Sequence, residues 1–236
     1  MFRHIRANIP NAITCLNMLC GAIACIMAFS YEQPVGALQG YQWAFVFICA
    51  SAVFDFLDGA MARLLHVYSL VGKELDSLSD LVSFGLAPAM LMYNTIAAYD
   101  PGSPLAYAAL VIAVCGGVRL ARFNVDDRQT TSFIGLPIPA NALLWIGAVA
   151  WVHTYSYVGT VALTVIMVLG SLLMVCPLPM FSLKFTNFGW RDNYMRYLLL
   201  GASLVFVVCQ GFAGFVWAIL LYLVMSVVQS RRGRAA

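Results

Sequence analysis

Apolar stretches of about 20 residues recur along the whole chain, and this is the length that an α-helix needs to cross the hydrocarbon core of a bilayer. Of the 236 residues, 62% are hydrophobic and only 10% are charged. Ordinary soluble domains have about 25% charged residues, so a water-soluble fold could not hide this much apolar surface. Because backbone polar groups in lipid must be satisfied within the protein, helices are favoured. The sequence therefore predicts an all-α, polytopic transmembrane helical bundle.

Eight spans are expected, separated by turn-forming segments such as Asp100-Pro101-Gly102. We expect residues 1–236 to form one integral membrane domain, with a short segment at 1–10 lying at the membrane surface. The expected spans are residues 12–30, 41–64, 73–98, 104–123, 136–153, 159–176, 195–210 and 213–230.

The distribution of positive charge predicts the orientation of these spans, since Lys and Arg accumulate on the cytoplasmic side. All thirteen Lys and Arg residues lie at the two termini, in alternate connections or at the span ends beside them. The connections near residues 31–40, 99–103, 154–158 and 211–212 have none. An even number of spans with both termini in the cytoplasm explains this pattern.

Four aspartates lie where apolar helix is expected, near the end of the second span and the start of the third. An ionised Asp at the centre of a membrane helix costs about 2.5–3.5 kcal/mol, so these residues need compensating partners. Helical periodicity places the acidic residues of each span on one face together with small residues. The short connection makes the two spans antiparallel neighbours whose acidic faces can meet around one cavity. The stripes are Asp55, Asp58, Gly59 and Ala62 on the second span, and Gly72, Asp76, Asp80, Ser83 and Ala87 on the third.

Four carboxylates at close quarters repel one another unless several are protonated or cations lie among them. An oxygen-only ligand set, without clustered Cys or His, favours Mg²⁺ or Mn²⁺ over zinc. The aspartates lie close in sequence to Arg63 and Lys73, near the cytoplasmic surface. This depth favours an enzyme over a divalent-cation transporter, whose site would lie nearer the midplane. Polar contacts that merely join two helices explain one such Asp more readily than four.

The spacing Asp55-x2-Asp58-Gly59-x2-Ala62-Arg63-x8-Gly72-x3-Asp76-x3-Asp80 resembles the signature of the CDP-alcohol phosphotransferases. The resemblance implies that the four aspartates hold two divalent ions and that Asp80 is also the catalytic general base. It further implies that Gly59, Ala62, Arg63 and Gly72 border CDP-diacylglycerol. Pro10-Asn11-x2-Thr14 resembles the N-terminal nucleotide-contacting stretch of the family, although an Asn or Thr at the start of a helix is more often a cap.

Three further segments are similar to the bacterial membrane-embedded phosphatidylserine synthases of this family. They are Ser83-Phe84-Gly85-Leu86-Ala87-Pro88, Arg119-Leu-Ala-Arg122-Phe123-Asn124 and Gly135-Leu136-Pro137-Ile138-Pro139. This resemblance implies transfer of the phosphatidyl group of CDP-diacylglycerol to L-serine, with release of CMP. It also implies a homodimer in the bacterial inner membrane, in contact with membrane lipids, with a cytoplasmic active site and no nucleic-acid partner.

Arg119 and Arg122 lie three residues apart at the cytoplasmic end of the fourth span, where a guanidinium could hold the carboxylate of serine. The alternative is that both arginines extend to the membrane surface without binding substrate. Asn124 could contact serine or cap the end of the helix. The sequence also allows two alternatives. One is a related enzyme that uses glycerol 3-phosphate or inositol as acceptor, and the other is a divalent-cation transporter.

Overall fold

The computed structural model describes residues 2–126, 133–181 and 189–233. Within them the regular structure is almost entirely helical, apart from two short antiparallel strand pairs. Five helical segments are long and apolar enough to cross a membrane, and two shorter apolar helices accompany them. The predicted all-α, polytopic architecture is confirmed. The five long segments are Asn8–Phe29, Gly40–Leu65, Leu70–Tyr99, Pro104–Val125 and Asn193–Ser230, and the shorter ones are Ile138–Thr154 and Thr160–Val175.

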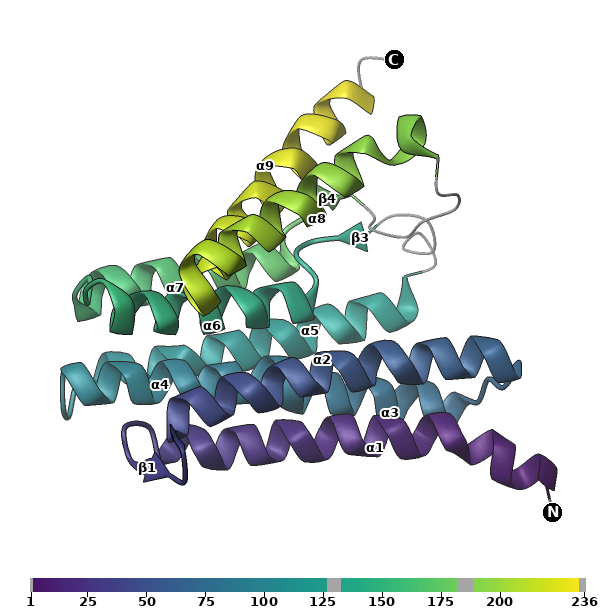
Figure 1. Cartoon of the computed structure of the whole chain (residues 1–236), viewed down its shortest axis with the longest axis horizontal. Helices are drawn as coiled ribbons and strands as arrows, with labels where there is room; N and C mark the ends of the chain where they lie inside the picture. The colour runs from purple at the N-terminus through teal and green to yellow at the C-terminus, as the bar shows by residue number, and fades with distance from the viewer. Residues whose placement is uncertain (1, 127–132, 182–188, 234–236) are drawn as a thin grey trace.

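The first two spans form an antiparallel pair. α1 comprises Phe2–Phe29 and α2 comprises Gly40–Leu65. A hairpin of two short strands, β1 (Pro34–Val35) and β2 (Leu38–Gln39), connects them. α1 is continuous through Pro10, so no break in the backbone separates the expected surface segment from the span. Figure 1 shows that α1 bends near its N-terminal end. Pro10, within this helix, has no backbone N–H to donate to the preceding turn.

The third span is one continuous helix with a wide turn in its middle. It comprises α3 (Leu70–Asp80), a π-helical segment η1 (Leu81–Leu86) and α4 (Ala87–Tyr99). It begins three residues earlier than the sequence predicts, because Ser69 caps the first turn by accepting a hydrogen bond from the Gly72 backbone N–H at 2.9 Å. The π segment follows Asp80 directly, and nothing in the apolar pattern predicted it.

The wide turn changes which residues share the acidic stripe. The Ser79 hydroxyl donates to the Thr14 carbonyl at 3.1 Å, and the Ser83 hydroxyl donates to the Asn17 carbonyl at 3.0 Å. Ser83 therefore lies with Ser79 on the face that packs against α1, and the prediction that it continues the stripe of Asp80 is wrong. A π turn has more residues than an α turn, so each residue advances less around the axis.

The remaining elements complete the bundle. The expected start of the seventh span is wrong by five residues, because helix begins at Trp190. α8 and α9 are joined by the short η4 segment, so that they form a hairpin (Figure 1). The elements are η2 (Pro104–Ala109), α5 (Leu110–Val125), β3 (Phe133–Ile134), α6 (Ile138–Thr154), α7 (Thr160–Val175), β4 (Pro179–Met180), α8 (Trp190–Gln210), η4 (Gly211–Ala213) and α9 (Gly214–Gly233).

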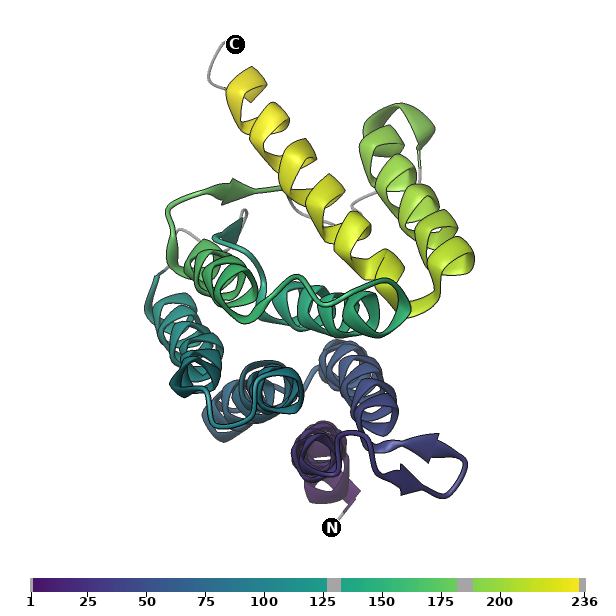
Figure 2. The ribbon, with the colours of Figure 1, turned by 90° about the vertical axis from the view of Figure 1, so that its left-hand side faces the viewer.

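Three helices near the N-terminus position the acidic residues. α1 lies against α2 on one side and against the α3–α4 helix on the other (Figure 2). α5 packs against η1 and α7, and α6 packs against both α4 and α9. Trp145 of α6 is fully buried where these layers meet. The N-terminus, the α2–α3 connection and the end of α5 lie at one end of the molecule, opposite the β1–β2 hairpin (Figure 1).

Candidate active site

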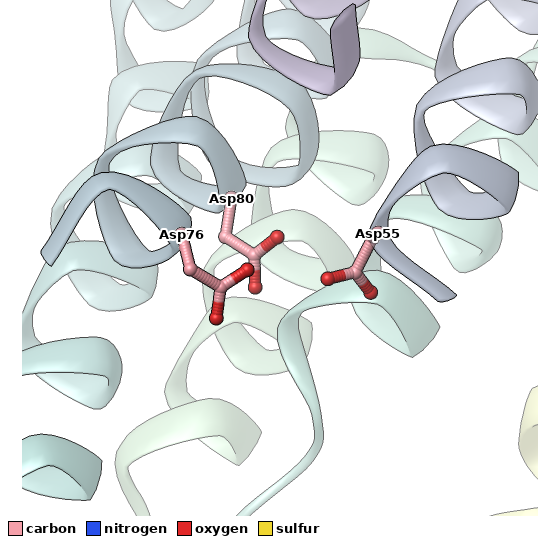
Figure 3. A group of neighbouring side chains, drawn as sticks. All are labelled: Asp55, Asp76 and Asp80. Carbon is pink, nitrogen blue, oxygen red and sulfur yellow. The ribbon is translucent and has the colours of Figure 1, made fainter. Parts of the chain in front are cut away.

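Three carboxylates converge between α2 and α3. One oxygen from each of Asp55, Asp76 and Asp80 lies within 4.8 Å of the other two. Figure 3 shows Asp55 pointing from α2 toward the pair on α3. Asp76 and Asp80 are four residues apart, so one helical turn places both on the same face. The spacing in the sequence therefore becomes a compact acidic cluster in space.

The donor chemistry of this cluster fits a hard divalent cation. Oδ1 of Asp76 and Oδ1 of Asp80 are buried, and neither accepts a hydrogen bond from any described residue. Buried carboxylate oxygens require a compensating partner, because desolvating them otherwise costs several kcal/mol. Among the residues that the structure describes, no Cys or His belongs to the cluster. Oxygen-only ligands of this kind suit Mg²⁺ or Mn²⁺.

Asp58 lies one turn beyond Asp55 on α2 and is oriented differently. Its Oδ2 accepts a 2.6 Å hydrogen bond from the Thr14 hydroxyl on α1. The group whose oxygens lie within 4.8 Å of one another does not include Asp58. The structure thus brings three of the four predicted ligands together and holds the fourth at the edge, because α1 packs beside α2 and offers a donor there. The predicted acidic cluster involved only the second and third spans, and α1 was not expected to take part in it.

A pocket of about 220 Å³ adjoins the cluster at the end of the bundle that contains the α2–α3 connection. Five of the six residues that the resemblance assigned to CDP-diacylglycerol line it, together with Asp58 and Asp76. Pro10, which belongs to the predicted N-terminal stretch, also lines the pocket. Sequence reasoning missed four other lining residues, most of them in the connection between α2 and α3, where no periodic pattern marks them. The predicted residues are Asn11, Thr14, Gly59, Ala62 and Gly72, and the missed ones are Val67, Tyr68, Ser69 and Lys73.

Arg63, the sixth predicted residue, does not line this pocket. Its side chain is exposed and folds back along α2 toward Gly59. A Cβ on Gly59 would lie 3.6 Å from Nη1 of Arg63. The guanidinium therefore lies beside the pocket, within reach of an anion that extends out of it.

Gly72 allows α1 and α3 to approach each other at the pocket. A Cβ at this position would lie 2.9 Å from Oδ1 of Asn11 and 2.9 Å from Oγ of Ser69. Contacts this short require a neighbour to move, and both neighbours are polar atoms of the pocket wall. The glycine of the signature therefore has a steric role.

A second pocket, of about 780 Å³, lies where α5 meets the end of α7. Arg119 and Arg122 both line it. Arg119 is only 7% exposed, and its Nε has no hydrogen-bond partner among the described residues. It lies within electrostatic range of Asp80, so it connects this pocket to the acidic cluster. The sequence did not predict the wall opposite the arginines, formed by Ile134, Met174, Val175, Cys176, Pro177 and Pro179.

Asn124 lies apart from this pocket. Its side-chain N–H donates to the Ser77 hydroxyl at 2.9 Å, and its backbone carbonyl accepts from Nζ of Lys73 at 3.0 Å. Both contacts join the end of α5 to α3. Of the two roles considered for Asn124, the structure favours a structural one.

The sequence profile described as CDP-alcohol phosphatidyltransferase matches residues 7–177, which include the acidic cluster and both pockets apart from Pro179. The chain belongs to the CDP-alcohol phosphatidyltransferase family. It is therefore an enzyme of a family whose fold is a helical membrane bundle, as the sequence predicts.

Three relatives of this family member are named CDP-diacylglycerol–serine O-phosphatidyltransferase. The protein from Bacillus subtilis is 37% identical over 161 residues, covering 68% of this chain and 86% of the relative. That from Methanocaldococcus jannaschii is 38% identical over 147 residues, covering 62% and 63%. That from Helicobacter pylori strain J99 is 32% identical over 203 residues, covering 84% and 81%.

Proposed function

We propose that this family member transfers the phosphatidyl group of CDP-diacylglycerol to the hydroxyl of L-serine, giving phosphatidylserine and CMP. The observation that carries the proposal is the position of the acidic cluster, which has a pocket lined by Asn11 and Thr14 on one side and the buried Arg119 on the other. A nucleotide and an acceptor that carries a carboxylate can thus both reach this cluster. The names of the relatives support the same reaction.

The smaller pocket suits the cytidine diphosphate part of the substrate. Lys73 lines it and supplies positive charge for a phosphate, while Arg63 lies beside it. Gly59 and Gly72 leave space for a ligand close to the helix backbones. The four aspartates would hold two divalent ions, Mg²⁺ or Mn²⁺, with Asp55, Asp76 and Asp80 as the central group. When bound, such ions neutralise charge on the pyrophosphate and on the departing CMP.

Asp80 is the proposed general base. The serine oxygen attacks the phosphorus attached to diacylglycerol, the bond between that phosphorus and the bridging oxygen breaks, and the electron pair leaves with CMP. The proton of the serine hydroxyl passes to a carboxylate oxygen of Asp80. This choice is supported by the electrostatic interaction of Asp80 with Arg119, which lines the proposed acceptor pocket.

The larger pocket suits an amino acid as acceptor. Arg119 and Arg122 offer guanidinium groups to a carboxylate, and the carboxylate of Asp126 lines the same pocket. A pocket with both signs of charge matches the zwitterion of serine better than the dianion of glycerol 3-phosphate or the neutral inositol. Asn124 contributes by holding α5 against α3.

The end of the bundle that contains the acidic cluster also suggests how the protein lies in the membrane. The acidic cluster lies near the α2–α3 connection, which Arg63 and Lys73 flank, so we place it at the cytoplasmic face of the bacterial inner membrane, with both termini on that side. Lipid chains would then reach the site from the bilayer while serine arrives from the cytoplasm. A homodimer and a single domain over residues 1–236 are part of the same proposal.

Purified protein in phospholipid vesicles, supplied with CDP-diacylglycerol and Mg²⁺ or Mn²⁺, tests this function. CMP release is measured with L-serine, glycerol 3-phosphate and inositol in parallel, and we expect release to depend on serine. CMP release only with another acceptor would agree with the chemistry of the family but would contradict serine as the acceptor. Cation flux across the vesicle membrane without CMP release would contradict the proposed transfer reaction and support cation transport.

A further inference from the structure

The last helix packs against β4, whose Pro179 lines the larger pocket, although this helix lies outside residues 7–177, the part of the chain that the family profile matches. Tyr222 of α9 is only 5% exposed. Its hydroxyl donates to the backbone carbonyl of Phe181 at 3.0 Å, and the two rings lie 5.8 Å apart. A buried donor of this kind fixes the main chain that it contacts.

Ser226, one turn further along α9, binds the backbone N–H of Phe181. Its hydroxyl oxygen lies 3.4 Å from the backbone nitrogen of Phe181, which donates to it. The Ser226 hydroxyl in turn donates to the Tyr222 carbonyl at 2.8 Å. Both backbone groups of Phe181 are thus tied to one face of α9. We call the set Tyr222, Ser226 and Phe181 the α9 latch.

The latch leads directly to the wall of the larger pocket. Phe181 follows β4, whose residues pair with β3 in the register Phe133 with Met180 and Ile134 with Pro179. Ile134 and Pro179 both line the pocket opposite the arginines. A shift of Phe181 away from α9 would therefore move this wall.

Tyr222 also lies within electrostatic range of Arg119. The guanidinium therefore lies near both Asp80 and the phenol of Tyr222. Arg119 has no hydrogen bond to its Nε among the described residues, so its position depends on these surroundings and on the ring of Phe123, whose centroid is 5.7 Å from its Cζ.

We propose that Tyr222 is a positioning residue for the acceptor: through the α9 latch it fixes the strand wall of the Arg119–Arg122 pocket. This inference rests on the proposed function, because it takes the larger pocket as the site of serine. It gives the C-terminal helix a role in acceptor recognition and none in nucleotide binding, since no residue of α9 lines the smaller pocket in the described part of the chain.

Steady-state kinetics of Tyr222→Phe test the proposal. The variant keeps the ring and removes the hydroxyl, so the strand wall loses one of the two bonds that hold Phe181 to α9. We expect the KM for serine to rise about tenfold, which corresponds to about 1.4 kcal/mol in binding. The KM for CDP-diacylglycerol and kcat at saturating serine stay unchanged. Ser226→Ala should shift the same constant in the same direction by a smaller factor. Tyr155→Phe is the matched control, because this tyrosine is 53% exposed and far along the chain from the latch.

The outcomes separate this inference from the function on which it rests. Wild-type protein that releases no CMP with serine overturns the function itself. Serine-dependent wild-type protein with an unchanged serine KM in Tyr222→Phe overturns only the positioning role. Equal increases in both KM values, or a lowered kcat with a lowered Tm, show a purely structural contact and also overturn it. The Ser226→Ala variant gives the answer if Tyr222→Phe does not fold.

Discussion

The hydroxyl of Thr14 on α1 donates a 2.6 Å hydrogen bond to Oδ2 of Asp58 on α2. This bond joins a residue of the N-terminal stretch to one of the four signature aspartates, and both side chains are buried. It explains why Asp58 lies outside the group formed by Asp55, Asp76 and Asp80. The pocket for the nucleotide is therefore built across three helices.

Replacement of Thr14 by Val removes this donor while nearly keeping the side-chain shape. We expect the KM for CDP-diacylglycerol to rise about tenfold, because a hydrogen bond to a charged acceptor contributes about 1.5–3 kcal/mol. The KM for serine stays unchanged. Thr164→Val serves as control, since the hydroxyl of Thr164 is buried without a hydrogen-bond partner among the described residues. Equal behaviour of the two variants would contradict the role of Thr14.

Asp80→Asn keeps the size of the side chain and removes its basicity. A general base contributes about 10²–10⁴-fold to rate, and we expect CMP formation to fall by at least the lower value, measured in single turnovers with bound CDP-diacylglycerol. Glu74→Gln on the same helix is the control, because Glu74 is exposed and distant from the cluster face. Near-normal turnover in Asp80→Asn would remove Asp80 as the base.

Thermal unfolding reports on the cation without any catalysis. Removing divalent ions with a chelator should lower Tm, and adding Mg²⁺ or Mn²⁺ should restore it in a concentration-dependent way, because a ligand that binds only the folded state stabilises it. In Asp76→Asn the response should shift to higher metal concentration, since one of three converging carboxylates is lost. If the Tm of detergent-solubilised wild-type protein does not change with these ions, the proposed metal site is contradicted.

Arg119→Ala and Arg122→Ala test how serine is held. We expect the serine KM to rise about tenfold or more in each, since each guanidinium offers charged hydrogen bonds to the carboxylate. Ethanolamine, which lacks the carboxylate, should be a poor acceptor for wild-type protein and should be used equally poorly by Arg122→Ala. Unchanged serine KM values in both variants would contradict a role in serine binding and favour arginines that only extend to the membrane surface.

Gly72→Ala tests close packing at the nucleotide pocket. The added Cβ would lie 2.9 Å from Oδ1 of Asn11 and from Oγ of Ser69. Overpacking of this kind costs about 1–3 kcal/mol, so Tm should fall and the KM for CDP-diacylglycerol should rise. Gly201→Ala is the control, because a Cβ there meets no atom within 4 Å and Tm should hold or increase slightly. Equal stability of both variants would show that the pocket wall adapts.

The sequence by itself determined the helical membrane fold, the span positions to within a few residues and the acidic faces. These follow from local rules: a span needs a fixed length of apolar chain, and helical periodicity places Asp76 and Asp80 on one side whatever the rest of the protein does. The pairing of Asp55 with them followed from the short α2–α3 connection. The start of α3 was misplaced because its cap at Ser69 carries no hydropathy signal. The start of α8 was misplaced because its first turn, Trp190-Arg191-Asp192-Asn193, is mostly polar.

Only the tertiary structure decided how the helices meet. The position of Asp58 depends on Thr14, which is 44 residues away in sequence and reaches it because α1 packs beside α2. The π turn after Asp80 moves Ser83 from the acidic stripe to the α1 face. The α9 latch joins Phe181 to Tyr222 and through β4 to the arginine pocket. Such contacts depend on packing between distant segments, which no local pattern of hydrophobic and polar residues specifies.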